Sequence, residues 1–212
     1  NNVDLPAGYS LNWSGQYEYM ERAKERLTIV VPITLVTIIL LLFLNFRNMA
    51  EVLIIMGTLP TALIGGVWLL YLLDYHMSVA VGVGFIALAG VAVEIGVVML
   101  VYLKQALASE KLKARKEQRS LVVSDLASAV TNGALMRVRP IMMTVAAIIA
   151  GLLPIMLGSG TGSEVMRRIA APMVGGMISA TLLTLALIPA IFLLWQRRRL
   201  VKGGVDSAGE FD

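Results

Sequence analysis

The chain has 212 residues, 58% of them hydrophobic, with a formal net charge of +4 and no cysteine, and its mean hydropathy is +0.79. The apolar residues fall in long blocks instead of the scattered periodic positions of a soluble domain, so a bilayer is the predicted solvent. The basic residues lie between those blocks and not on one face, which argues against nucleic acid as a partner. The lack of cysteine excludes disulfides and thiolate metal sites.

Five apolar stretches are long enough to cross a membrane, because a spanning helix needs about 20 apolar residues that each rise roughly 1.5 Å. The predicted fold class is therefore an all-α integral membrane protein. The predicted spans are residues 27–46, 52–73, 78–103, 140–157 and 169–195. We divide the chain into a junction (1–26), three spans (27–103), a basic loop with an interfacial helix near 120–136 (104–139), two spans (140–196) and a tail (197–212).

The lysines and arginines predict the orientation of these spans. Basic residues gather in the connection 104–139 and again at 197–199, so both segments are predicted to be cytoplasmic. An odd number of spans then places the N-terminal stretch on the opposite side of the membrane. The chain begins with Asn1 and has no signal-peptide layout, so we expect it to be a piece of a larger protein.

Glu94 is the one charged residue deep within an apolar stretch, the predicted span 78–103. A carboxylate at that depth is disfavoured by on the order of several kcal/mol, so it must face the bundle interior or hold a proton. Ala87 and Gly90 share its face at helical spacing, and small residues let another helix approach closely. We predict that Glu94 points at a partner helix and exchanges protons; the alternative is a neutral, hydrogen-bonded structural glutamate.

The 12 methionines carry thioether sulfur, a soft ligand suited to Cu(I) or Ag(I). Most are expected to fill apolar gaps. Met166 differs because it follows the glycine- and serine-rich loop 158–163 at the predicted outer mouth of the last span, and composition leaves its role as ligand or packing residue open. We expect His76 to be solvated on an exposed hairpin, and Arg137 and Arg139 to anchor a helix end at the lipid headgroups.

Motifs for nucleotide or zinc chemistry do not occur in the sequence. The pair Gly82-Val83-Gly84 lacks the preceding strand and the third glycine of a dinucleotide site. Transport by this protein would then draw on an ion gradient or on a part outside this chain. No cofactor is predicted.

Four stretches resemble the resistance-nodulation-division (RND) pumps, and within them the heavy-metal efflux branch. Leu5-Pro-Ala-Gly-Tyr with Trp13-Ser-Gly-Gln is similar to the junction from a periplasmic domain into the eighth helix of such a pump. Residues 78–94, which end in Ala-Val-Glu94, resemble the tenth helix. Gly133-Ala-Leu-Met-Arg-Val-Arg-Pro140 resembles the entry to the eleventh helix, and Gly162-Ser-Glu-Val-Met166 resembles the entry to the twelfth.

This resemblance implies a twelve-helix protomer, of which the chain supplies helices eight to twelve, in a homotrimer in the inner membrane of a Gram-negative bacterium. It implies export by proton antiport through a periplasmic adaptor and an outer-membrane channel protein. In the copper/silver exporters of the branch, the position of Glu94 belongs to the proton relay. The position of Met166 belongs there to a ladder of methionines that passes Cu(I) and Ag(I).

One position departs from the copper/silver pattern. Ile141 follows the Arg-Val-Arg-Pro motif where those pumps have a lysine of the relay. Without that cation, the charged form of Glu94 loses a stabilising neighbour, so either the relay runs between carboxylates alone or the coupling differs in detail. Two other interpretations stay open, an exporter of divalent metal cations or organic compounds and a membrane scaffold fragment without transport of its own.

Overall fold

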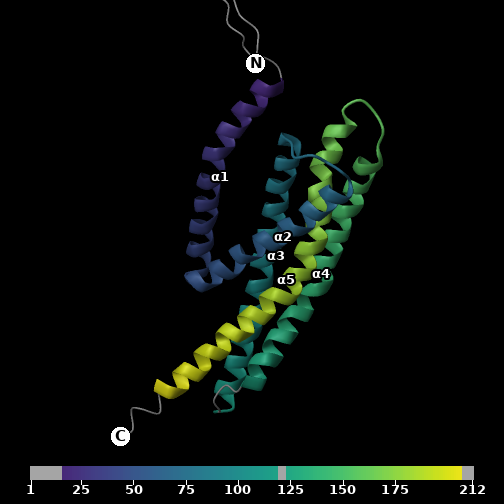
Figure 1. The fold of residues 1–212 in the computed structure, drawn as a ribbon. Helices are drawn as coiled ribbons and strands as arrows, with labels where there is room; N and C mark the ends of the chain where they lie inside the picture. Colours follow the sequence, from purple (N-terminus) through teal and green to yellow (C-terminus); the bar gives the residue numbers. More distant parts are fainter. Residues whose placement is uncertain (1–15, 119–122, 207–212) are drawn as a thin grey trace, which may run out of the picture. The chain divides into compact units, whose positions relative to one another are not determined.

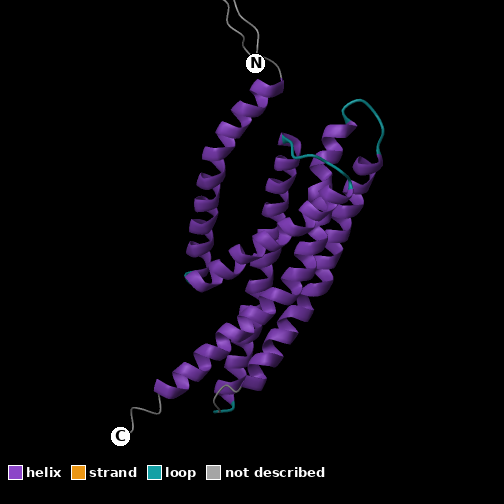
Figure 2. Cartoon of the chain, in the orientation of Figure 1, coloured by secondary structure: helices purple, strands orange, loops and turns teal. Residues whose placement is uncertain are grey.

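The computed structural model describes residues 16–118 and 123–206, which form five long α-helices and no strand (Figures 1 and 2). The helices are α1 (Gln16–Phe46), α2 (Met49–Leu72), α3 (Val79–Lys116), α4 (Val123–Leu157) and α5 (Ser163–Asp206). Each contains a stretch that is long and apolar enough to cross a membrane. The predicted all-α membrane fold with five spans is therefore confirmed for the described part of the chain.

The first helix belongs to a compact unit separate from the rest of the chain, which begins at Phe46. The predicted junction 1–26 lies partly outside the described residues, and its remainder from Gln16 onward forms the first turns of α1. Apolar side chains such as Ile29 and Val36 are exposed along α1. The hydroxyls of Thr34 and Thr37 each donate to a backbone carbonyl four residues earlier, so they are satisfied without water.

The second unit holds α2 to α5, and α5 packs against each of the other three helices (Figure 1). Two clusters of small or aliphatic side chains join α2, α3 and α5. They are Ala62, Ala92 and Ala180, and, nearer to the turn 73–78, Leu70, Val81 and Ala171. Small side chains let helix axes come close, which is the main source of attraction between helices in a bilayer.

Glycines leave no side chain between the backbones where α2 crosses α5. A Cβ atom added to Gly65 would collide with the Gly175 carbonyl oxygen and with the Ser179 side chain. A Cβ added to Gly175 would lie 2.5 Å from the Gly65 carbonyl oxygen. The Ser179 hydroxyl also donates to the Ala62 carbonyl of α2 at 3.2 Å. Glycine is required at this crossing because the two main chains touch.

The connection between the third and fourth spans is more helical than the sequence predicted. α3 continues to Lys116 instead of ending near residue 103, and α4 begins at Val123. The separate interfacial helix predicted near 120–136 is therefore the first part of α4, apart from residues 119–122, which lie outside the described residues. The two extensions stabilise each other, since Leu126 of α4 is fully buried and a Cβ on Gly133 would lie 2.9 Å from the Ala106 Cβ of α3.

The last helix is also longer than its predicted span. α5 begins at Ser163 and continues to Asp206, through most of the predicted tail 197–212, whose residues 207–212 lie outside the described part. Beyond the span, the Arg199 guanidinium lies 4.3 Å from the Trp195 ring centroid. This cation–π contact is the type expected where an apolar helix leaves the membrane for water.

Replacing Gly65 by alanine is expected to destabilise the second unit by about 1–3 kcal/mol, the usual effect of overpacking, because the added methyl group meets a backbone carbonyl that cannot move aside. The measurement is the free energy of unfolding of the chain in mixed micelles titrated with SDS. Gly57→Ala on the same helix is the control, since nothing lies within 4 Å of its added Cβ; we expect it to be neutral or to stabilise by up to about 1 kcal/mol. Equal free energies for the two variants would contradict the glycine crossing.

Candidate functional site

Glu94 lies within the apolar part of α3, on a face that the described residues leave open. Its side chain is exposed, as are Ala87 and Gly90, which precede it by seven and four positions. No atom of the described residues lies within 4 Å of a Cβ atom built on Gly90. The three residues thus form a common face with small residues beside the acid, as their spacing predicted.

None of the other described helices of the second unit, α2, α4 and α5, covers that face. The opposite side of α3 is packed, with Ala92 fully buried and Ile95 8% exposed. Glu94 forms no hydrogen bond or ion pair with another described residue. None of α2, α4 and α5 is the partner helix of Glu94, because other side chains of α3 face these helices. That Glu94 points at a partner helix stays a prediction. Apolar surroundings disfavour an unpaired carboxylate, so Glu94 needs a proton or a partner from outside α2 to α5.

A cation next to Glu94 is absent from the described residues as well. Ile141 stands where the resemblance led us to look for a lysine, and its side chain is buried at 4% exposure. The next basic residue along α3 is Lys104, ten positions or about 15 Å further. Lys104 is paired with Glu51 at 2.8 Å. Glu94 therefore has no cation beside it among the described residues of α2 to α5.

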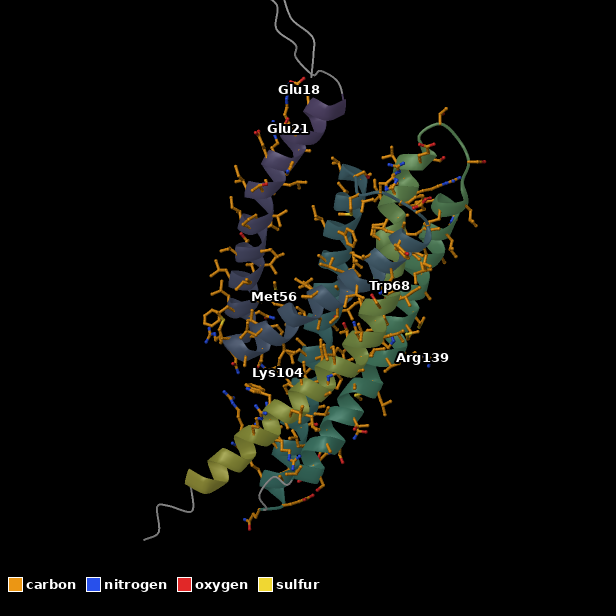
Figure 3. The ribbon with its side chains drawn as sticks, in the orientation of Figure 1. Glu18, Glu21, Met56, Trp68, Lys104 and Arg139 are labelled. Carbon is orange, nitrogen blue, oxygen red and sulfur yellow. The ribbon has the colours of Figure 1, made fainter. Side chains whose placement is uncertain are left out.

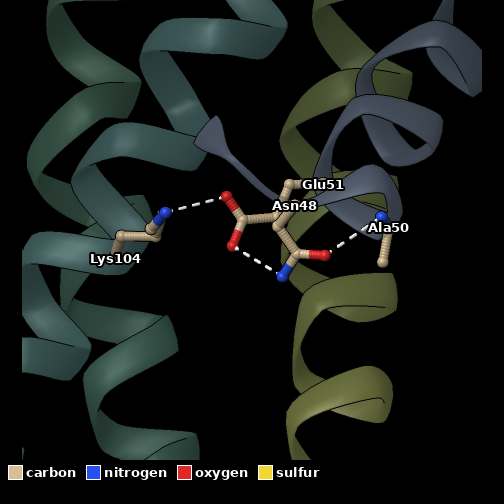
Figure 4. A network of polar contacts seen from close by, with 4 residues as sticks. All are labelled: Asn48, Ala50, Glu51 and Lys104. Carbon is tan, nitrogen blue, oxygen red and sulfur yellow. Dashed lines mark hydrogen bonds and ion pairs between the residues drawn. The ribbon is translucent and has the colours of Figure 1, made fainter. Parts of the chain in front are cut away.

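Sequence reasoning missed a second acid, Glu51, at the N-terminal end of α2, here called the basic end because Lys104 of α3 lies beside it. Glu51 lies in the first turn of α2, is 4% exposed, and pairs with Lys104 of α3 (Figure 4). A signal was present in the sequence. Asn48 is a typical N-cap residue, and an acid at the third helical position after it completes a capping pattern.

Met166 lies at the start of α5, beside the loop that joins α4 to α5. The loop residues 158–163, Ile155 and Met166 line a shallow hollow of about 530 Å³. The Met166 side chain is 48% exposed there. The loop is held by hydrogen bonds, because the Arg167 guanidinium donates to the Gly158 carbonyl and the Ser163 N–H donates to the Gly160 carbonyl at 3.1 Å. The Met166 thioether is therefore accessible at the surface, in the hollow beside this loop.

The structure does not bring Glu94 and Met166 together. Glu94 lies close in sequence to Ala92, which contacts Ala180 of α5. Met166 lies 14 positions before Ala180, or about 21 Å along the helix. Met166 and Glu94 are therefore two separate candidate sites.

The other candidates from the sequence show no ligand set among the described residues. The Arg137 guanidinium lies 5.0 Å from the Tyr102 ring centroid, and its Nε atom is buried without a hydrogen-bond partner. Arg139 is exposed on α4 (Figure 3). His76 is exposed, and the described residues contain no group of three or more His, Cys, Asp or Glu side chains that could hold a metal ion. Headgroup anchoring by the two arginines stays a prediction.

An acid inside one span of an all-α bundle is an arrangement typical of secondary transporters. The chain matches the model of the AcrB/AcrD/AcrF family over residues 1–196. It therefore belongs to this family of RND pumps, and its relatives place it in the heavy-metal efflux branch. Its five helices correspond to helices eight to twelve of the twelve in such a pump.

Several cation efflux proteins are similar to the chain over almost its whole length. The cation efflux system protein CusA of Escherichia coli strain K12 is 52% identical over 201 residues, which are 94% of this chain and 19% of CusA. The putative cation efflux system protein SilA of Salmonella typhimurium is 54% identical over 197 residues, covering 92% of this chain and 19% of SilA. A crystal structure of a heavy metal efflux pump superposes with a TM-score of 0.73 at 36% identity, over 92% of this chain and 18% of that one. The chain thus spans about a fifth of the length of these relatives.

The two buried or intramembrane acids are expected to differ in reactivity towards dicyclohexylcarbodiimide, an apolar reagent that modifies protonated carboxyl groups. Glu94, unpaired and open to the apolar phase, should react more than about tenfold faster than Glu51, whose carboxylate is held in an ion pair. Mass spectrometry of the chain in lipid nanodiscs measures both sites, with Glu94→Gln as the control for assignment. Equal labelling of the two acids would contradict the assigned environments.

Proposed function

We propose that the chain is the membrane part of a proton-driven exporter of Cu(I) and Ag(I), in which Glu94 carries the proton and Met166 contributes a metal ligand. The observation that carries the proposal is the unpaired Glu94 carboxyl inside a span of an RND heavy-metal efflux protein. The pump belongs, in this proposal, to the inner membrane of a Gram-negative bacterium.

The environment of Glu94 suits a proton carrier. An apolar phase favours the neutral acid, while a charged or polar partner brought to the open face of α3 would favour the carboxylate. Ala87 and Gly90 leave room beside Glu94 for such a partner, which must come from outside α2 to α5. Loading and release of the proton then follow the approach and withdrawal of that partner, and this links the protonation of Glu94 to helix packing.

Met166 suits a soft monovalent metal. Its thioether is accessible in the hollow beside the loop 158–163, and Cu(I) and Ag(I) prefer sulfur ligands over the oxygen ligands of hard cations. One thioether does not complete a metal site. The remaining ligands must come from the part of the pump outside this chain, in keeping with the resemblance to a methionine ladder.

The buried Ile141 determines which groups can take part in the proton relay, because it is uncharged. A neutral, buried side chain at this position supplies no cation to stabilise ionised Glu94. We propose that the relay in this pump runs between two carboxyl groups. One is that of Glu94, and the other belongs to an acid in the part of the pump outside this chain. Two carboxylates that approach each other favour sharing a proton, because like charges in a low dielectric repel strongly.

The transport partners follow from the family resemblance. A complete pump would act as a homotrimer of twelve-helix protomers and pass the metal to a periplasmic adaptor and an outer-membrane channel protein. The described helices would contact lipid with exposed apolar side chains such as Leu53, Val67 and Leu72 of α2.

Export of divalent cations is the second candidate function, because relatives named for such metals match the same stretch. The cobalt-zinc-cadmium resistance protein CzcA of Cupriavidus metallidurans is 39% identical over 198 residues, covering 93% of this chain and 17% of CzcA. The lower identity, against 52% for CusA and 54% for SilA, and the motif resemblance to copper/silver exporters favour the monovalent metals. Growth of cells carrying the full-length pump on a panel of metals and drugs separates the two functions, and the absence of any protection would favour a scaffold role.

Replacing Glu94 by glutamine in the full-length pump is expected to abolish resistance to silver and copper. Glutamine keeps the size and hydrogen bonding of the side chain but cannot release a proton, so transport should fall by about 100-fold or more. The measurement is growth in rising silver and copper at matched amounts of pump in the membrane. Full protection by the variant would show that the proton path lies elsewhere and that Glu94 is structural.

Met166→Leu tests the metal ligand separately from the proton carrier. Leucine has a similar volume, so folding should change by less than about 1.5 kcal/mol, while the lost thioether should lower silver resistance by about tenfold. Met143→Leu is the matched control, because Met143 is exposed on α4 away from the hollow. An equal effect of the two substitutions would argue against Met166 as a ligand.

A further inference from the structure

An ion pair with a buried carboxylate joins the first turn of α2 to α3 at the basic end. The Lys104 Nζ of α3 lies 2.8 Å from Oε2 of Glu51, whose side chain is 5% exposed, whereas that of Lys104 is 41% exposed (Figure 4). The two residues are 53 positions apart, so the pair is a tertiary contact and not a feature of one helix. Nothing in the transport mechanism above uses it.

The rest of the polar network fixes the position of the Glu51 carboxylate. The Asn48 side-chain amide donates to the other oxygen, Oε1, at 3.4 Å, and the Asn48 Oδ1 accepts from the Ala50 N–H at 3.2 Å. The N-terminal end of α2 also favours a negative charge in its first turn. On the cation side, Lys104 Nζ lies 5.3 Å from the centroid of the Phe46 ring. Both charges of the pair are therefore held by further contacts.

This network fixes the position of α3 along its axis, and its rotation about that axis, relative to α2. A buried carboxylate that loses the cation paired with it is strongly disfavoured, because desolvation penalises an unpaired charge. Turning α3 by one residue rotates Lys104 by about 100°, and sliding it by one turn moves Lys104 by about 5.4 Å. Either movement would break a contact of 2.8 Å. α2 and the basic half of α3 must therefore move together.

The ion pair of Glu51 and Lys104 also determines the direction in which Glu94 points. Glu94 and Lys104 lie on one uninterrupted α-helix, which contains no proline. Between them, Met99, Leu100 and Leu103 are fully buried and pack α3 against the other helices. A rotation of α3 at Lys104 is thus transmitted to Glu94, about 15 Å away, and would turn the acid out of line with a partner on the open face.

We infer that Glu51 and Lys104 are a positioning pair for the proton-carrying step, which holds α3 at the depth and rotation where Glu94 meets its partner. This inference rests on the proposed function of Glu94. The pair touches neither the metal nor the proton, and it acts through the seating of α3. In transport, α2 and α3 then move as one body.

A second ion pair on the same helix offers a matched control. Lys113 Nζ lies 2.7 Å from the Glu110 carboxylate, three positions earlier on α3, and its side chain is 63% exposed. The Glu110 carboxylate raises the pKa of Lys113 through its hydrogen bond and its charge. Because both partners belong to α3, this pair cannot fix α3 against another helix.

The experiment measures Ag(I) transport by the full-length pump in proteoliposomes with an imposed pH gradient, at matched amounts of inserted protein. Lys104→Met is expected to lower the maximal rate by about tenfold or more while the KM for Ag(I) stays within about twofold, because the metal site is untouched. Lys104→Arg, which restores a cation, should recover most of the rate. Lys113→Met should transport like the unmodified pump.

A double variant guards against misfolding of Lys104→Met. Glu51→Gln combined with Lys104→Met removes both charges, so no unpaired charge is buried, and it should show the same loss of rate because the ion pair is gone. Dicyclohexylcarbodiimide labelling of Glu94 in the full-length pump gives a second readout, expected to change by about threefold or more in the double variant as α3 turns.

Two results would overturn the inference. One is an unchanged rate in Lys104→Met or in the double variant, and the other is a loss that Lys104→Arg does not recover. Glu94→Gln in the same assay separates this outcome from failure of the proposed function. If Glu94→Gln stops transport while Lys104→Met does not, only the positioning role fails. If Glu94→Gln transports Ag(I) normally, or if the unmodified pump moves no Ag(I), the proposed function fails and the positioning role fails with it.

Discussion

The contact between α2 and α5 depends on the absence of side chains at one crossing. Gly65 and Gly175 bring the two main chains so close that a methyl group on either would strike a carbonyl oxygen of the other. In lipid, apolar side chains gain nothing by leaving the solvent, so close backbone packing and hydrogen bonds such as that from Ser179 to Ala62 must supply the attraction. α5 in turn packs against α3 and α4. The second unit is thus built around α5, which packs closely on α2 because Gly65 and Gly175 lie at their crossing.

The sequence was sufficient for the number and type of the elements, because span length and apolar content are set by the bilayer and not by tertiary contacts. The ends of the helices were less predictable. Polar residues beyond residue 103 read as a loop, yet they continue α3 because α4 packs on them, with Gly133 against Ala106. Packing of one polar segment on another leaves no apolar block in the sequence to reveal it.

For the candidate site, the sequence identified the residue types and missed their surroundings. Spacing correctly placed Ala87, Gly90 and Glu94 on one face, since helical periodicity alone decides that. It could not show that this face is open, because which side of α3 is packed depends on distant residues such as Ala180. The pair of Glu51 and Lys104 was missed for the same reason, as its partners stand 53 positions apart.

The length of α2 has a consequence for the membrane itself. With 24 residues it measures about 36 Å, and it ends at both sides in residues with left-handed backbone, Arg47 at φ +51° and Asp74 at φ +55°. α3, α4 and α5, with 38, 35 and 44 residues, are longer than a crossing of the hydrocarbon layer requires, whereas α2 is bounded at both ends by non-helical residues. α2 exceeds a hydrocarbon layer of about 30 Å by only a few residues, so a much thicker membrane would strain this helix before its longer neighbours.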